Sequence, residues 1–130
     1  NGGPDNPNFE YVFSHTDAAP LDQLIAFALV SDALSEGAYE ELRSRFLEAP
    51  NTVLAYLVLM GDQTVDFWDN PPAAEVICKE IASADAAWHG GTAEFTQTME
   101  VCRETYSSGP IAKLLDVMEE EYKASIERNQ

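Results

Sequence analysis

Two histidines, His15 and His89, are the only side chains in this sequence whose ordinary pKa suits general acid–base chemistry near neutral pH. A hydrolytic triad needs a nucleophile, such a base and an acid that orients it. His15 lies in a polar stretch, and His89 precedes Gly90 at the end of a predicted helix, where a protonated ring complements the helix dipole. The sequence contains no HExxH, Walker A, GxGxxG or zinc-type CxxC pattern. We therefore predict no catalytic residues, no cofactor and no metal site, and we do not expect an enzyme.

Carboxylates are abundant, but their spacing does not define a catalytic or metal-binding pattern. The run Glu119–Glu121 falls on a predicted helix and is typical of a solvated face. Asp62, Asp66 and Asp69 flank a predicted loop, yet they lack the alternate-residue ligands and the glycine of an EF-hand. We expect neither a glycosidase-type carboxylate pair nor a calcium site.

The same loop is better suited to contact another protein. It places Phe67 and Trp68 among Asp62, Asp66 and Asp69, directly before a Pro-Pro pair. Aromatic anchors surrounded by acids match the surface of a basic partner. The alternative is that Phe67 and Trp68 turn inward and cover the end of the helical bundle. These five residues are the candidate partner-binding site.

The two cysteines lie at equal distances from a predicted chain reversal. Gly90 and Gly91 form a tight turn, so the helices before and after it should run antiparallel, with Cys78 and Cys102 facing each other. Helix axes ~8–10 Å apart allow inward-pointing Cβ atoms to approach disulfide distance. We predict a Cys78–Cys102 disulfide and therefore a periplasmic or extracellular location. The alternative is that both cysteines are free, buried fillers of the core.

The charge of the chain is strongly negative, because 23 Asp and Glu face seven Lys and Arg, for a formal net charge of −16. Residues 1–42 contain eight acids and no Lys or Arg. Such a field repels the phosphates of nucleic acids and anionic lipids and attracts cationic proteins. The longest strongly apolar stretch, Val53–Met60, is far shorter than the ~20 residues that cross a bilayer. We expect a basic protein partner, no nucleic acid and no membrane insertion, although charge of this size can also serve solubility alone.

Local signals divide the chain into helices. Residues 1–16 are expected to form a flexible lead-in, and residues 17–130 a single helical domain. Proline and glycine boundaries, caps and apolar periodicity predict helices over 20–37, 38–49, 52–60, 71–89, from Thr92 onward and from Pro110 onward. The segment 38–49 places Arg43 on its polar face with Glu40, Glu41 and Glu48. The composition of 52–60 would also suit a buried strand.

These elements predict an all-α fold: a compact bundle of five to six helices, with an antiparallel C-terminal helical hairpin followed by a final helix. The apolar stripes of the last three helices include Phe95, Met99, Leu114, Met118 and Tyr122. Paired short helices leave a short helical-repeat arrangement open as an alternative.

Charge, size and the lack of catalytic motifs favour a non-catalytic acidic protein-interaction domain. The most concrete version is an immunity or inhibitor protein that occludes a basic partner such as a secreted bacterial toxin, with electrostatic steering for fast association. One alternative is a carrier whose cavity for a small apolar ligand lies between the Leu24–Val30 and Val53–Met60 segments. An enzyme without a recognisable motif is the remaining one.

Overall fold

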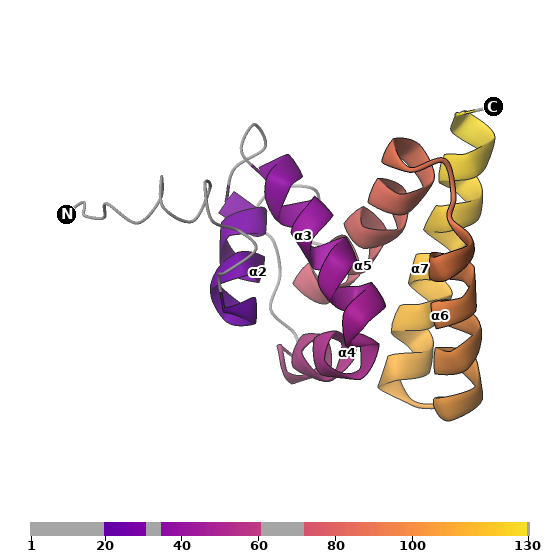
Figure 1. The fold of residues 1–130 in the computed structure, drawn as a ribbon. Coiled ribbons are helices and arrows are strands. Elements are labelled where there is room, and N and C mark those ends of the chain that lie inside the picture. The colour runs from indigo at the N-terminus through magenta and orange to yellow at the C-terminus, as the bar shows by residue number, and fades with distance from the viewer. Residues whose placement is uncertain (1–19, 31–34, 61–71, 130) are drawn as a thin grey trace.

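The computed structural model describes residues 20–30, 35–60 and 72–129, which form six α-helices and one π-helical turn. Figure 1 shows them arranged as an all-α bundle, which confirms the predicted fold class. Residues 1–16, His15 and the partner-binding candidates at 62–69 lie outside the described residues, so the predictions made for them stay predictions.

The N-terminal half contains α2 (Leu21–Val30), α3 (Ser35–Glu48) and α4 (Pro50–Leu59). Pro20 lies directly before α2, and its carbonyl accepts a hydrogen bond from the Leu24 amide at 2.9 Å. Gly37, which we predicted to end a helix, instead lies inside the first turn of α3. The first turn tolerates glycine because its amides have no partner within the helix.

The segment 52–60 is helical, as predicted, and not a strand. Its start differs from the prediction, because Pro50 occupies the first turn of α4 and Ala49, not Asn51, is the N-cap residue. Proline fits this position since its missing N–H would have no partner there. A helix that begins at Pro50 directly after α3 turns the chain sharply between the two helices (Figure 1).

The C-terminal half contains α5 (Ala73–Ser83), the π turn (Ala84–Trp88), α6 (Ala93–Thr105) and α7 (Pro110–Arg128). Gly90 and Gly91 adopt φ values of 74° and 81°, and Gly109 adopts 90°. Such left-handed conformations favour glycine and reverse the chain. The predicted boundaries at Gly90–Gly91, Thr92 and Gly109–Pro110 are therefore confirmed.

One hydrophobic core joins all six helices. Its fully buried side chains include Leu24, Leu42, Phe46, Leu54, Ile77, Ile81, Phe95, Leu115 and Met118. α7 packs most extensively on α5 and much less on α6. None of the described helices is long and apolar enough to cross a bilayer.

The predicted disulfide is wrong. Cys78 and Cys102 are both buried and both free. The prediction assumed that α5 and α6 share the main seam of the C-terminal half, but the main neighbour of α5 is α7. Both cysteines are free, buried side chains that fill the core, as the alternative predicted. Without a disulfide, they give no argument for an oxidising compartment.

Candidate functional site

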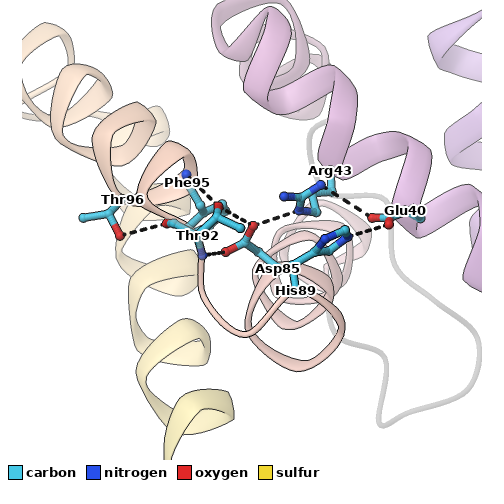
Figure 2. A network of polar contacts seen from close by, with 7 residues as sticks. All are labelled: Glu40, Arg43, Asp85, His89, Thr92, Phe95 and Thr96. Carbon is cyan, nitrogen blue, oxygen red and sulfur yellow. Dashed lines mark hydrogen bonds and ion pairs between the residues drawn. The ribbon is translucent and has the colours of Figure 1, made fainter.

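A buried polar junction joins α3, the π turn and the start of α6. At its centre is Asp85, whose side chain is 0% exposed. Its carboxylate accepts hydrogen bonds from Arg43 Nε at 2.8 Å, from the Thr92 amide at 2.8 Å and from Thr92 Oγ1 at 2.9 Å. Figure 2 shows these side chains converging from three elements. The π turn and α6 are thereby fixed to α3 through one carboxylate.

Thr92 also begins α6. Its hydroxyl oxygen accepts a hydrogen bond from the Phe95 amide at 3.1 Å while the same hydroxyl donates to Asp85. An N-cap of this kind satisfies one of the amides that the first helical turn leaves without a partner. The cap and the buried carboxylate are therefore coupled, because one hydroxyl serves both (Figure 2).

His89 lies at the solvent-facing side of the junction. Its amide donates to the Asp85 carbonyl at 3.1 Å, and its ring Nε2 lies 2.5 Å from Glu40 Oε2. Glu40 also lies 3.8 Å from Arg43 Nη1. His89 therefore stands at the end of the π turn, as the sequence predicted, and its ring also contacts Glu40 of α3.

The junction is a structural element: the Asp85 carboxylate is hydrogen-bonded within the chain, and among the described residues the buried Oε1 of Glu40 is the junction oxygen left without a hydrogen-bond partner. Asp85 and Arg43 are both buried, so each compensates the charge of the other. The donors around Asp85 come from the protein itself, which leaves the carboxylate no role in binding a ligand. Among the described residues, no group of three or more His, Cys, Asp or Glu side chains could hold a metal ion.

A groove with a volume of about 490 Å³ lies between α6 and α7. We call it the α6–α7 groove. Phe95, Thr96, Met99, Glu100, Arg103 and Glu104 line it from α6, and Glu119, Tyr122 and Lys123 line it from α7. The rings of Phe95 and Tyr122 stack with centroids 4.7 Å apart and an interplanar angle of 18°. The groove thus combines an apolar floor with a charged rim.

Arg103 connects the two walls of the groove. Its Nη2 lies 2.7 Å from Asp116 Oδ1 and 3.1 Å from Glu119 Oε1, both on α7. Partial burial opposes the charged form of Arg103, but these two carboxylates outweigh burial and raise the pKa of the guanidinium. The cation is therefore neutralised by the protein's own acids.

Tyr122 touches both the groove and the junction. Burial raises the pKa of its phenol, and the negative charge of nearby Asp85 adds to the effect. Its hydroxyl also lies close to Gly91, where an added Cβ would be 2.8 Å away. A single side chain therefore packs against the Gly90–Gly91 turn and supplies part of the groove floor.

The acids predicted to form a solvated helix face behave in part as expected. Glu119 and Glu120 are exposed, whereas Glu121 is half-buried and accepts hydrogen bonds from Ser125 Oγ at 3.0 Å and Arg128 Nη2 at 2.6 Å. On α6, Glu100 and Glu104 are exposed, lie one helical turn apart and line the α6–α7 groove.

A second, smaller groove of about 260 Å³ lies between α6 and the boundary of α3 and α4. Leu47, Pro50 and the 59% exposed Val101 contribute its apolar surface. Glu94 lines both this groove and an adjoining depression that includes Glu48. The two grooves therefore lie along different sides of α6.

Comparisons with known protein families, curated proteins and solved structures found no match for this chain.

The sequence analysis missed both the buried polar junction and the α6–α7 groove. It placed Arg43 on a polar helix face, although Arg43 is 8% exposed and paired with Asp85. An acid within the Ala-rich run 82–87 was the available signal for a buried partner. It assigned Phe95, Met99 and Tyr122 to core stripes, which is correct for burial but gives no indication of a groove beside them.

Proposed function

We propose that this protein is a non-catalytic, acidic interaction domain that binds a basic protein. The observation that carries the proposal is the imbalance of ion pairs. All four arginines bind acids of the same chain: Arg43, Arg45, Arg103 and Arg128. Within the described part of the chain, nine carboxylates form no ion pair with another described residue: Asp22, Glu48, Glu75, Glu80, Glu94, Glu100, Glu104, Glu120 and Glu127.

These surplus carboxylates are distributed over several helices, so the negative field extends over much of the described surface. Exposed charges of one sign accelerate the encounter with an oppositely charged protein and disfavour partners of the same sign. Because the field is screened over ~8 Å at physiological salt, its effect on association depends strongly on ionic strength. A cationic protein surface is the partner that benefits most from this arrangement.

An inhibitor of the immunity type, which occludes the basic surface of a secreted toxin, is the most concrete version of the proposal. Occlusion needs surface complementarity and no reactive group. The saturated hydrogen bonding of Asp85 agrees with this role, since the most deeply buried carboxylate of the described chain stabilises the fold and is closed to substrate.

The carrier alternative receives less support. It required a cavity between the segments 24–30 and 53–60, but the side chains that would line it belong to the packed core. Leu24 and Leu54 are 0% exposed, Leu57 is 1% exposed and Ile25 is 2% exposed. We propose no second function.

The test uses cationic proteins from the source cell, enriched on a cation exchanger at neutral pH, as the probe. These proteins are passed over the immobilised chain and, in parallel, over immobilised polyglutamate. We expect a protein that the chain retains and polyglutamate does not. Its association rate should fall about tenfold between ~50 and ~300 mM salt. Retention of the same set by both surfaces, or association that is independent of salt, would contradict the proposal.

A further inference from the structure

We propose that the α6–α7 groove is the docking site for a segment of the basic partner in which Lys or Arg flank one large apolar side chain. This inference rests on the proposed function and adds to it the place of contact and the chemistry of the contacting segment. Three features of the groove support it: the apolar floor, the acidic rim, and the pairing of Arg103 with acids of the same chain.

The floor of the groove suits an apolar anchor. Phe95 and Tyr122 form a stacked aromatic pair with centroids 4.7 Å apart, and Met99 lies on the same wall as Phe95. The half-buried ring of Tyr122 offers an aromatic face to a partner at low entropic cost, while Phe95 and Met99, which are 1% and 7% exposed, lie in the core beside it. A volume of about 490 Å³ accommodates one large side chain, such as Trp or Leu, with part of its backbone.

The rim of the groove suits cations along its α6 wall. Glu100 and Glu104 are exposed there and carry no ion pair to another described residue, whereas Glu119 on the α7 wall is bound by Arg103. Of the two cationic residues in the lining, Arg103 already binds Asp116 and Glu119. Lys123 is the remaining one, so a cationic segment meets more carboxylates than it meets competing ammonium groups.

The other described surfaces fit such a segment less well. The junction around Asp85 is buried and its donors are internal. The smaller groove has exposed Val101 and nearby Glu94 but no aromatic residue in its lining. It therefore provides a comparison surface with acids but without the stacked floor.

The first experiment maps the binding of three blocked tripeptides by amide chemical shifts in the full chain. The probes are Lys-Trp-Lys, which has anchor and charge, Lys-Ala-Lys, which has charge alone, and Glu-Trp-Glu, which has the anchor alone. We expect saturable shifts for Lys-Trp-Lys that concentrate on residues 95–104 and 119–123. Lys-Ala-Lys should bind about tenfold more weakly, and Glu-Trp-Glu should give no saturation.

The second experiment compares two double charge reversals of equal net effect. Glu100→Lys with Glu104→Lys changes the rim of the α6–α7 groove, and Glu48→Lys with Glu94→Lys changes acids beside the smaller groove. All four side chains are exposed and carry no ion pair to another described residue, so both variants should retain the helical circular dichroism of the parent. The groove variant should bind Lys-Trp-Lys about tenfold more weakly, and the matched control should bind it less than threefold more weakly.

Shifts scattered over many acids, equal losses in the two variants, or the absence of saturable binding by Lys-Trp-Lys would overturn the groove proposal. The proposed function has a separate outcome, because it depends on the cationic protein retained by the immobilised chain. If that protein binds both double variants equally weakly, an acidic binding domain remains and the groove is excluded. If no such protein is retained while Lys-Trp-Lys still occupies the groove, the function fails and the groove remains.

Discussion

The polar junction and the α6–α7 groove use the same residue types in opposite ways. In the junction, the Asp85 carboxylate is 0% exposed and accepts three hydrogen bonds from Arg43 and Thr92. In the groove, Glu100 and Glu104 face solvent on one helix. Burial and internal donors therefore decide whether a carboxylate of this acidic chain is bonded within the fold or faces solvent.

The largest expected effect comes from removing the charge at the centre of the junction. Asp85→Asn keeps the shape of the side chain but removes the closer and fully buried counter-charge of Arg43, leaving only the partly exposed Glu40 at 3.8 Å. We expect the free energy of unfolding to fall by about 3–5 kcal/mol, as when one partner of a buried ion pair is removed. Urea denaturation measures it.

Arg43→Met with Asp85→Asn serves as the control for this prediction. The double variant should recover part of the loss, because no unpaired charge is then buried. A loss below about 1 kcal/mol for Asp85→Asn alone would mean that the buried carboxylate of the junction stabilises the fold no more than an exposed carboxylate of the groove.

The next effect concerns the turn that connects the junction to α6. In Gly91→Ala, the new Cβ would lie 2.8 Å from both Ile126 Cδ1 and Tyr122 Oη, at a φ of 81°. We expect a loss of about 2–4 kcal/mol from backbone strain and steric overlap together. Gly90→Ala is the matched control, since Gly90 has a φ of 74° but no atom within 4 Å of its added Cβ. It should lose only about 1 kcal/mol, and equal losses in urea denaturation would rule out the close approach of Tyr122.

A smaller effect isolates the hydroxyl that the cap and the junction share. Thr92→Val removes the hydrogen bonds of Oγ1 to Asp85 and from the Phe95 amide while preserving the shape of the side chain. We expect a loss of about 1–2 kcal/mol by thermal or urea denaturation. Thr92→Ser keeps the hydroxyl and should recover most of this loss, and a serine variant as unstable as the valine variant would assign the effect to packing.

The smallest expected effect is a gain in stability, and it comes from Glu80, which is repelled by Glu121. Partial burial, with added repulsion from Glu121, raises the pKa of Glu80 on α5. A carboxyl whose pKa is raised by folding destabilises the native state above that raised value, and this penalty disappears as pH falls below the pKa of the unfolded chain. Glu80→Gln should therefore raise the melting temperature by about 2 °C at neutral pH. It should give no gain in acid, and a gain that is independent of pH would contradict the electrostatic cause.

The sequence predicted where helices begin and end better than it predicted which helices pack against each other. Thr92 and the pair Gly109–Pro110 mark boundaries correctly because caps and turns depend on a few adjacent residues. The assignment of α6 as the partner of Cys78 failed because α7 packs most extensively on α5, and that choice depends on residues far apart in the chain.

The candidate site was harder to predict than the fold. The pairing of Arg43 with Asp85 joins positions 42 residues apart and depends on a π turn that no local signal specified. Periodicity identified Phe95, Met99 and Tyr122 as inward-facing, but whether two helices close over such residues depends on the packing of both. The loop at 62–69, which the sequence favoured, lies outside the described residues.

The two free cysteines give the chain built-in reporters of local opening. Cys78 on α5 is 0% exposed and Cys102 on α6 is 1% exposed, and burial raises the pKa of both thiols. Since the thiolate is the form that attacks an alkylating reagent, each sulfur should be labelled only when its helix detaches from the core. α6 has far sparser contacts than α5, so we expect Cys102 to be labelled first. The order of labelling therefore records, without any engineered probe, how readily the outer wall of the bundle separates from its centre.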